Sequence, residues 1–404
     1  MKFIFLALNI YLVTSFNITD TTLKIKQILI HSNKNRYPRC LRSEKIDSFL
    51  SKSISFFEKT DRFGEFLKFS NLSDCESGAS DAYVENHVLH GLIIHNLPEI
   101  HWHEFKNVHN KSYSTARQEM AALNVWKENL KKVAKHNKEY LAGEKSYSLH
   151  LNHFADMSMS DYFKNILKHI PTVRLFDPFE DHHRSTLRKT SKQKTPRQVD
   201  WRKRGYTPKR EEQWKCGACY AFAVTHALQA QLYKKHRSWK ELSPQQIVDC
   251  SSKDGNVGCN GGSLRAALSY VAREGLATEA DYPYVGKQGR CKISPFVRRV
   301  KPHRWAMLPP GDERAIERAV ATIGPLPVAV NAIPFTFQLY SGIYDDPFCT
   351  GWMLNHAMLL VGYTQEYWIL LNWWGTDWGE DGYIRIRRGF NVCGVANMAA
   401  YIEL

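Results

Sequence analysis

The sequence predicts an α+β architecture in which a helical half is followed by a β-rich half, with a cleft between the two halves. Between residues 196 and about 300, apolar residues recur with helical spacing, whereas short apolar and aromatic runs typical of strands dominate after 300. The chain has 404 residues, of which 43% are hydrophobic, so it exceeds the length of one ordinary domain. We therefore expect two or three units.

Three helices are expected in the first of these halves. The long apolar stretch 220–233 predicts one helix, and 264–272 predicts another. A third is expected to begin at Leu242-Ser243-Pro244, because serine caps helices and proline is tolerated in their first turn. The strands expected in the second half are 327–330, 357–363, 367–371 and 382–387.

The chain as a whole is expected to contain five segments. Residues 1–15 join a short basic head to an apolar stretch, which predicts a signal peptide; a buried N-terminal strand is the alternative. Residues 16–100 form an N-terminal extension to which we assign no role. From Trp102 the apolar spacing is helical, so 101–160 is expected to be a helical domain. Residues 161–195 are charged and aperiodic, as in a linker open to proteolysis, and 196–404 form the α+β part.

The nine cysteines indicate disulfides in an exported protein, and their odd number indicates one free thiol, for which Cys219 is the candidate. Cys40 and Cys75 either staple the extension or stay unpaired, or one of them pairs with another chain. Glycosylation sequons at Asn17, Asn71 and Asn110 fit the secretory pathway, with a lysosomal or extracellular destination.

The net charge of +15 is spread along the chain, and no basic block is interleaved with stacking aromatic residues. A solvated basic surface is therefore expected, not a nucleic-acid site. No later apolar run reaches the ~20 residues that a membrane-spanning helix needs. The histidine-rich stretches lack ordered ligand spacing, so we expect no metal and no cofactor.

A cysteine, a histidine and two amide side chains form the candidate catalytic group. Gln213 precedes Cys219 by six positions, His356 follows Cys219 by 137, and Asn372 follows His356 by 16. A thiol near its unperturbed pKa of ~8.5 must be ionised by its surroundings to attack a carbonyl at acid or neutral pH. Cys219 is expected in the first turn of a helix, where free N–H groups favour a thiolate, and the imidazolium of His356 is expected to stabilise it further. Asn372 would orient the imidazole, and Gln213 would donate to the oxyanion, a contact worth roughly 3–4 kcal/mol.

These residues resemble the signature of the papain family, which is carried here by Gln213-x-x-Cys216-Gly217-Ala218-Cys219-Tyr220 with His356 and Asn372 downstream. The similarity runs from about Trp102 to Leu404, and further matching blocks are Cys259-Asn260-Gly261-Gly262, Asn355-His356-Ala357 and 374–383. The resemblance implies a cathepsin L-like cysteine endopeptidase made as a zymogen. The implied fold is papain-like and two-lobed, with a helical left lobe, a β-rich right lobe and a helical prosegment before them.

The resemblance also implies disulfides and a substrate-binding set. Sequence alone allows 15 pairings of six cysteines, and the family pairing would be Cys216–Cys259, Cys250–Cys291 and Cys349–Cys393. The implied substrate-binding residues are Gly262, Leu264, Ala329, Leu354, Ala357, Trp374 and Met398. None of these side chains is charged, so we expect an apolar residue to be preferred at the second subsite on the acyl side.

The region 102–156 resembles the inhibitory propeptide of the same family, through Trp126, Asn129, Val133 and Asn137 and through Asn152-x-Phe154-x-Asp156. We therefore expect 101–160 to inhibit the enzyme within its own chain and cleavage near Lys194 to release it; a helical accessory domain without inhibitory role is the alternative. Protein and peptide substrates and cystatin-like inhibitors are the other expected partners.

Several residues depart from the usual family pattern, and Leu371, where lysine is common, is one of them. Trp214 stands where glycine is common, Tyr220 where tryptophan is common, and Trp373 where serine is common. Bulk at Trp214 and Trp373 is expected to narrow the leaving-group side or tilt Gln213. Two alternatives follow, namely a weakly active or inactive homologue that binds peptides or proteins, and a secreted structural protein whose first 100 residues carry the function.

Overall fold

The computed structural model describes residues 98–167 and 194–404, with side chains from residue 101 onward. The chain divides into two compact units, of which the first ends at Leu151 and the second begins at Asn152. Several expected features lie outside the described residues: the signal peptide, most of the extension with Cys40 and Cys75, the sequons at Asn17 and Asn71, and the greater part of the linker.

The first unit contains α6 (Pro98–Val108), α7 (Ala116–Leu141) and β1 (Tyr147–Leu149). Helix α7 begins after Thr115, whose side chain accepts a hydrogen bond from the backbone of Gln118 and so caps the helix. Its buried stripe includes Trp126, which confirms the helical spacing seen in the sequence. Asn137 exchanges two hydrogen bonds of 2.8 Å with the backbone of Leu149, which fastens β1 alongside the helix.

The second unit is built around one buried helix. Helix α10 (Cys219–His236) is buried throughout its first 14 residues, as expected for a helix that is apolar on all sides. The capped start at Ser243-Pro244 is confirmed, because the Ser243 hydroxyl accepts from the backbone of Gln246. The other helices of this unit are α8 (Met159–Tyr162), the π-helix η2 (Phe163–Leu167), α11 (Pro244–Cys250), α12 (Leu264–Glu274), α13 (Glu313–Thr322), α14 (Phe335–Gln338) and the short 3-10 turns η3 (Ser252–Asp254), η4 (Gly258–Asn260) and η5 (Val392–Gly394).

Five strands after residue 300 form the sheet of the second unit together with one short strand from its beginning. Its members are β2 (Val199–Asp200), β4 (Leu326–Val330), β5 (Tyr340–Tyr344), β6 (His356–Tyr363), β7 (Tyr367–Leu371) and β8 (Tyr383–Arg387). Strand β6 pairs antiparallel with β2, β4 and β7, β8 pairs antiparallel with β7, and β5 runs parallel to β8. A separate antiparallel pair joins β3 (Arg304–Met307) to β9 (Ala400–Glu403).

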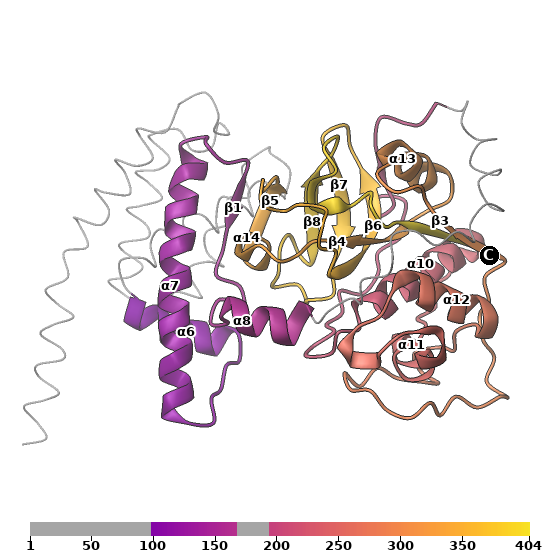
Figure 1. The fold of residues 1–404 in the computed structure, drawn as a ribbon, viewed down its shortest axis with the longest axis horizontal. Coiled ribbons are helices and arrows are strands. Elements are labelled where there is room, and N and C mark those ends of the chain that lie inside the picture. Colours follow the sequence, from indigo (N-terminus) through magenta and orange to yellow (C-terminus); the bar gives the residue numbers. More distant parts are fainter. Residues whose placement is uncertain (1–97, 168–193) are drawn as a thin grey trace, which may run out of the picture. The chain divides into compact units, whose positions relative to one another are not determined.

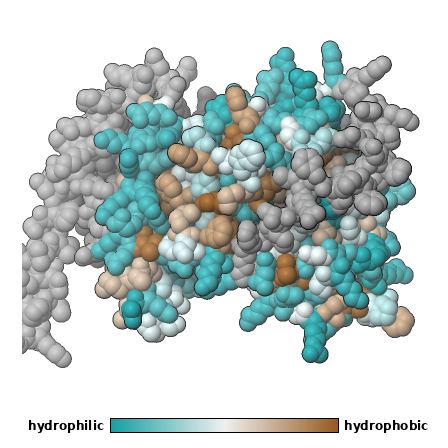
Figure 2. Space-filling view, in the orientation of Figure 1, coloured by the Kyte–Doolittle hydropathy of each residue, from teal (hydrophilic) through white to brown (hydrophobic). Residues whose placement is uncertain are grey.

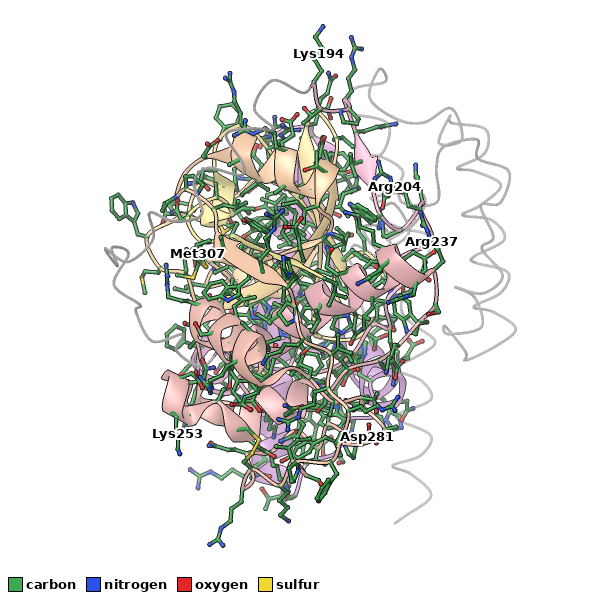
Figure 3. The ribbon with its side chains drawn as sticks, turned by 90° about the vertical axis from the view of Figure 1, so that its right-hand side faces the viewer. Lys194, Arg204, Arg237, Lys253, Asp281 and Met307 are labelled. Carbon is green, nitrogen blue, oxygen red and sulfur yellow. A yellow bond between two sulfur atoms is a disulfide. The ribbon has the colours of Figure 1, made fainter. Side chains whose placement is uncertain are left out.

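Helices α10, α11 and α12 gather on one side of the sheet of this unit, which confirms the α+β prediction (Figure 1). Figure 1 shows α10, α11 and α12 together below the strands, with α10 nearest the sheet, where it contacts β4 and β6. Hydrophilic side chains predominate over this helical part in Figure 2. The basic side chains labelled in Figure 3 project from the periphery, as a solvated basic surface requires; they are Lys194, Arg204, Arg237 and Lys253.

Two further features position the site. The second unit contains the disulfides Cys216–Cys259, Cys250–Cys291 and Cys349–Cys393, the pairing that the resemblance implies. The first of them ties the loop before α10 to η4. Helical structure also continues to Leu167, beyond residue 161 where we expect the linker to begin, because Tyr162, Ile166 and Leu167 are buried.

Candidate active site

The candidate nucleophile stands at the N-terminus of the central helix. Cys219 is the first residue of α10. Ala218, at the N-cap position, has no side chain that could accept hydrogen bonds from the backbone N–H groups of the first turn. The loop leading into the helix is held by a hydrogen bond of 2.8 Å from the Gly217 N–H to the Cys259 carbonyl. Cys219 is only 1% exposed and is the free thiol among the described cysteines.

Sheet pairing brings the candidate histidine and asparagine together. His356 begins β6, Asn372 directly follows β7, and these two strands are antiparallel neighbours. The Nε2 atom of His356 lies 2.7 Å from Oδ1 of Asn372, whereas Nδ1 of the buried imidazole has no hydrogen-bond partner among the described residues. The Trp374 ring stacks on the imidazole at 4.6 Å and packs edge-on against Trp378, so the pair is shielded from water.

The candidate oxyanion donor, Gln213, is hydrogen-bonded to the segment that follows β7. The Gln213 N–H donates to the Trp373 carbonyl at 2.9 Å, and its side-chain Nε2 donates to the Cys216 carbonyl at 2.9 Å. The Tyr284 hydroxyl donates to the Gln213 carbonyl at 2.8 Å. Two hydrogen bonds therefore fix the backbone of Gln213, and the bond from Nε2 to Cys216 holds its side-chain amide close to the loop that leads into α10.

The two departing tryptophans lie in different surroundings. Trp214 has a φ of +51° and is 54% exposed, with its ring stacked on Tyr284 at 5.5 Å. The left-handed backbone explains why glycine suits this position. Trp373, by contrast, is buried behind the candidate catalytic residues, where its indole N–H donates to the Ala357 carbonyl at 2.8 Å. Its bulk is thus packed into the core.

The charge state of the site differs from the sequence-based expectation. Burial raises the pKa of the Cys219 thiol to about 11, although backbone hydrogen bonds, first of all from Ala357, act in the opposite direction. Burial also lowers the pKa of His356 to about 4, against the hydrogen bond to Asn372. At pH values between these two pKa values, the thiol and the imidazole are both neutral, so the thiolate that we expect is not favoured in this buried state.

Residues 152–167 cover this region. The Asn152 side chain donates a hydrogen bond of 2.8 Å to the Gln338 carbonyl. The Gln338 side chain in turn donates to the carbonyls of Phe154 and Met157. The Tyr162 hydroxyl donates to the Ala332 carbonyl at 3.0 Å, and its ring packs edge-on against Trp374. The Ile166 carbonyl lies 3.4 Å from Gln213 Nε2. A peptide carbonyl of the chain itself therefore already accepts a hydrogen bond from the candidate oxyanion donor.

The expected subsite residues come from four segments. Ala329 on β4 faces Ala357 on β6 in the strand register, and the Ala329 N–H donates to the Met398 carbonyl at 2.8 Å. Leu264 begins α12, which contacts β4. A side chain on Gly262 would collide with Tyr220, so this glycine allows the chain to pass close to the residue after the nucleophile. Leu354 lies beside Gly394, and the set is uncharged.

Sequence reasoning missed two residues behind the site. His226 on α10 lies 2.6 Å from the carboxylate of Glu211 and packs against Trp373. Helical spacing offered a signal, because positions 219, 222 and 226 share one face of a helix.

Among residues 98–167 and 194–404, no group of three or more histidine, cysteine or acidic side chains is arranged to hold a metal ion. No helix in these same ranges is long and apolar enough to cross a membrane.

Comparison with known proteins agrees with this geometry. Residues 195–403 match the papain family cysteine proteases, and residues 102–162 match the cathepsin propeptide inhibitor domain (I29). A cathepsin L-like peptidase from Aedes aegypti is 35% identical over 324 residues, which cover 76% of this chain and 94% of that protein. Cathepsin S from Bos taurus is 37% identical over 321 residues, covering 77% and 95% respectively.

A solved zymogen shares both the fold and the order of its parts. Digestive procathepsin L 3 from the larval midgut of Tenebrio molitor superposes with a TM-score of 0.69 at 35% identity, covering 76% of this chain and 99% of that one. The papain-like two-lobed fold with a prosegment is thereby confirmed. The chain belongs to the papain family of cysteine proteases, as a cathepsin L-like cysteine-type endopeptidase carried in a zymogen with an inhibitory prosegment.

Proposed function

We propose that the enzyme hydrolyses peptide bonds through an acyl-enzyme formed on Cys219. The observation that carries this proposal is the hydrogen bond between His356 Nε2 and Asn372, which leaves Nδ1 of the buried imidazole available to exchange a proton with the thiol. In the uncovered enzyme, the proton of Cys219 passes to His356, and the thiolate and imidazolium stabilise one another at the N-terminus of α10.

A named residue then acts in each step of the proposed hydrolysis. The thiolate sulfur adds to the carbonyl carbon of the substrate, and the resulting oxyanion accepts from Gln213 Nε2 and the Cys219 N–H. The imidazolium of His356 protonates the leaving amine as the C–N bond breaks, which leaves a thioester. Water gives one proton to His356 and attacks the thioester, and the thiol is regenerated as the acid product leaves. Asn372 keeps the imidazole oriented throughout.

We also propose that the second acyl-side subsite prefers bulky apolar residues. Ala329 and Ala357 are small and fully buried, so they leave room at this part of the cleft. Met398, which the family resemblance assigns to the floor of this subsite, is apolar and brings no charge. A peptide-library profile should therefore rank leucine, valine or phenylalanine well above arginine. Preference for arginine would contradict the assignment.

Activation is proposed to follow removal of the prosegment by cleavage near Lys194, on a secretory route that ends in the lysosome or outside the cell. Acid is expected to promote release by protonating carboxylates and histidines that hold the prosegment. Sequencing the N-terminus of the processed form tests the cleavage site. A mature start well inside 200–215 is incompatible with the proposal, because it would remove the buried Trp201 from the folded unit.

The decisive experiment incubates the purified zymogen at acid pH under mild reduction and then measures hydrolysis of a dipeptidyl fluorogenic substrate. Activity that is abolished by Cys219→Ser and by a thiol-directed epoxide supports the peptidase. Failure of the epoxide to label Cys219 in processed protein would instead favour the alternative of a binding module.

A further inference from the structure

One stripe of helix α10 links the candidate nucleophile to a buried histidine. Cys219, Phe222 and His226 stand at positions i, i+3 and i+7, so their side chains lie on one face of the helix. His226 is therefore about 10 Å along the helix axis from Cys219. It is only 1% exposed, and the proposed chemistry gives it no role.

The ring of Trp373 rests on this stripe. It stacks on Phe222 with ring centroids 5.4 Å apart and lies 4.7 Å from the imidazole of His226. Its indole N–H donates to the Ala357 carbonyl at 2.8 Å. The indole is therefore held between α10 and β6, and His226 sets how far it can move along the helix.

The backbone of Trp373 touches both amide residues of the site. Its N–H donates to Oδ1 of Asn372 at 2.8 Å, the same oxygen that accepts from His356. Its carbonyl accepts from the Gln213 N–H at 2.9 Å. A shift of the Trp373 ring is thus passed directly to the residue that orients the imidazole and to the residue that donates to the oxyanion.

His226 holds the second of these segments by a polar contact as well. Its Nε2 lies 2.6 Å from the carboxylate of Glu211, two residues before Gln213. The carbonyl of Glu211 accepts from the Gly375 N–H at 3.3 Å, which joins the two segments once more. Nδ1 of His226 has no hydrogen-bond partner within the described ranges, so the contact with Glu211 alone fixes the orientation of the ring through a hydrogen bond.

An apolar side chain at position 226 would fill the same space without the cost of burying two polar groups. Unlike an apolar side chain, the histidine makes two different contacts. Its ring packs on Trp373, and its Nε2 contacts the carboxylate of Glu211. We propose that His226 is a positioning residue for peptide hydrolysis, which through Trp373 and Glu211 holds Asn372 and Gln213 in register with Cys219. The inference rests on the catalytic roles proposed above.

The test compares processed wild-type enzyme with His226→Ala, His226→Phe and Glu211→Ala. The value of kcat is expressed per site titrated with a thiol-directed epoxide, so unfolded molecules do not count. A peptide aldehyde measures the oxyanion site, because its adduct with the thiol places an oxygen where the tetrahedral intermediate has one. Tyr206→Phe is the matched control, since it removes a buried hydrogen bond to the His226 carbonyl and leaves the ring contacts intact.

We expect His226→Ala to lower kcat per site about 10- to 100-fold, because a displacement of about 1 Å near the reacting atoms costs up to a hundredfold. KM should stay within threefold, and the aldehyde should bind about 10-fold more weakly or worse. His226→Phe and Glu211→Ala each keep one of the two contacts and should show intermediate losses. Tyr206→Phe should lower the melting temperature alone.

Values of kcat and aldehyde affinity within twofold of wild type in these variants would overturn the inference. If His226→Ala yields no titratable site, His226→Phe and Glu211→Ala decide the matter by the same criteria. A wild-type enzyme without an epoxide-reactive Cys219 would overturn the proposed function together with this inference. Wild-type activity with unaffected variants would overturn this inference alone.

Discussion

Nε2 of Gln213 lies 3.4 Å from the carbonyl oxygen of Ile166, so the amide proposed to hold the oxyanion is already in contact with a peptide carbonyl of the chain itself. The same short segment packs Tyr162 against Trp374, which shields the histidine–asparagine pair. The inhibitory segment therefore contacts the groups to which we assign catalysis, and the strength of inhibition can be measured through residues that contact the segment.

Gln338 is the first such residue. Its side chain donates to the carbonyls of Phe154 and Met157, and Gln338→Leu removes both hydrogen bonds. Each such bond contributes about 0.5–1.5 kcal/mol, so we expect the half-time of acid processing to shorten about 10-fold. Gln231→Leu is the control, because it removes a buried amide bonded to the Ile323 carbonyl. Equal half-times for the two variants would contradict the prediction.

The thiol should report removal of the prosegment. Burial raises the pKa of Cys219 to about 11 and lowers the pKa of His356 to about 4 in the covered state. Iodoacetamide should thus modify Cys219 slowly in the zymogen at pH 6, with a rate that rises only towards pH 11. Processing should increase the rate at pH 6 by more than about 10-fold, as expected for a thiolate–imidazolium pair. Peptide mapping assigns the modified cysteine, and equal rates before and after processing would refute this account.

Trp214 combines a left-handed backbone with a stacked ring. Trp214→Ala loses the ring but keeps a side chain at positive φ, whereas Trp214→Gly loses the ring and relieves the backbone. The difference should be about 1 kcal/mol in favour of glycine, or about 2–4 °C in melting temperature for a domain of this size. Scanning fluorimetry of the two variants under one condition measures it. A glycine variant that melts at or below the alanine variant would show that the position is unstrained.

Glu279 should make stability depend on pH. Burial raises its pKa from 4.5 to about 7, despite a backbone hydrogen bond from Tyr284 that opposes the change. The folded protein therefore keeps this carboxyl protonated after the unfolded chain has ionised, so stability falls as pH rises from 4.5 through 7. Glu279→Gln keeps the acceptor without the charge.

The free energy of unfolding of the variant should match that of wild type near pH 4.5 and exceed it by about 1 kcal/mol at pH 8. This value is reduced to allow for the partial exposure of the side chain. Thermal unfolding of processed enzyme at the two pH values provides the comparison. A stability difference that is the same at both would rule out the carboxyl as its source.

The sequence by itself determined the local elements and the identity of the reacting groups. Apolar residues recur with helical spacing in α7 and α12, and apolar or aromatic runs mark α10 and the strands β4, β6, β7 and β8, so these elements were visible in the sequence. The cap at Ser243-Pro244 was visible because its chemistry acts within one turn. The order of Gln213, Cys219, His356 and Asn372 was enough to indicate a cysteine nucleophile.

Only the tertiary structure decided what those groups experience. The pairing of β6 with β7 places His356 against Asn372. Burial raises the pKa of the Cys219 thiol and lowers the pKa of the His356 imidazole, which favours neutral groups, opposite to the charged pair that the sequence suggested. The contacts of His226 with Trp373 and Glu211 likewise join residues from three separate segments. Charge state and register depend on desolvation and on distances between groups remote in the chain, and neither is encoded in a local pattern of residues.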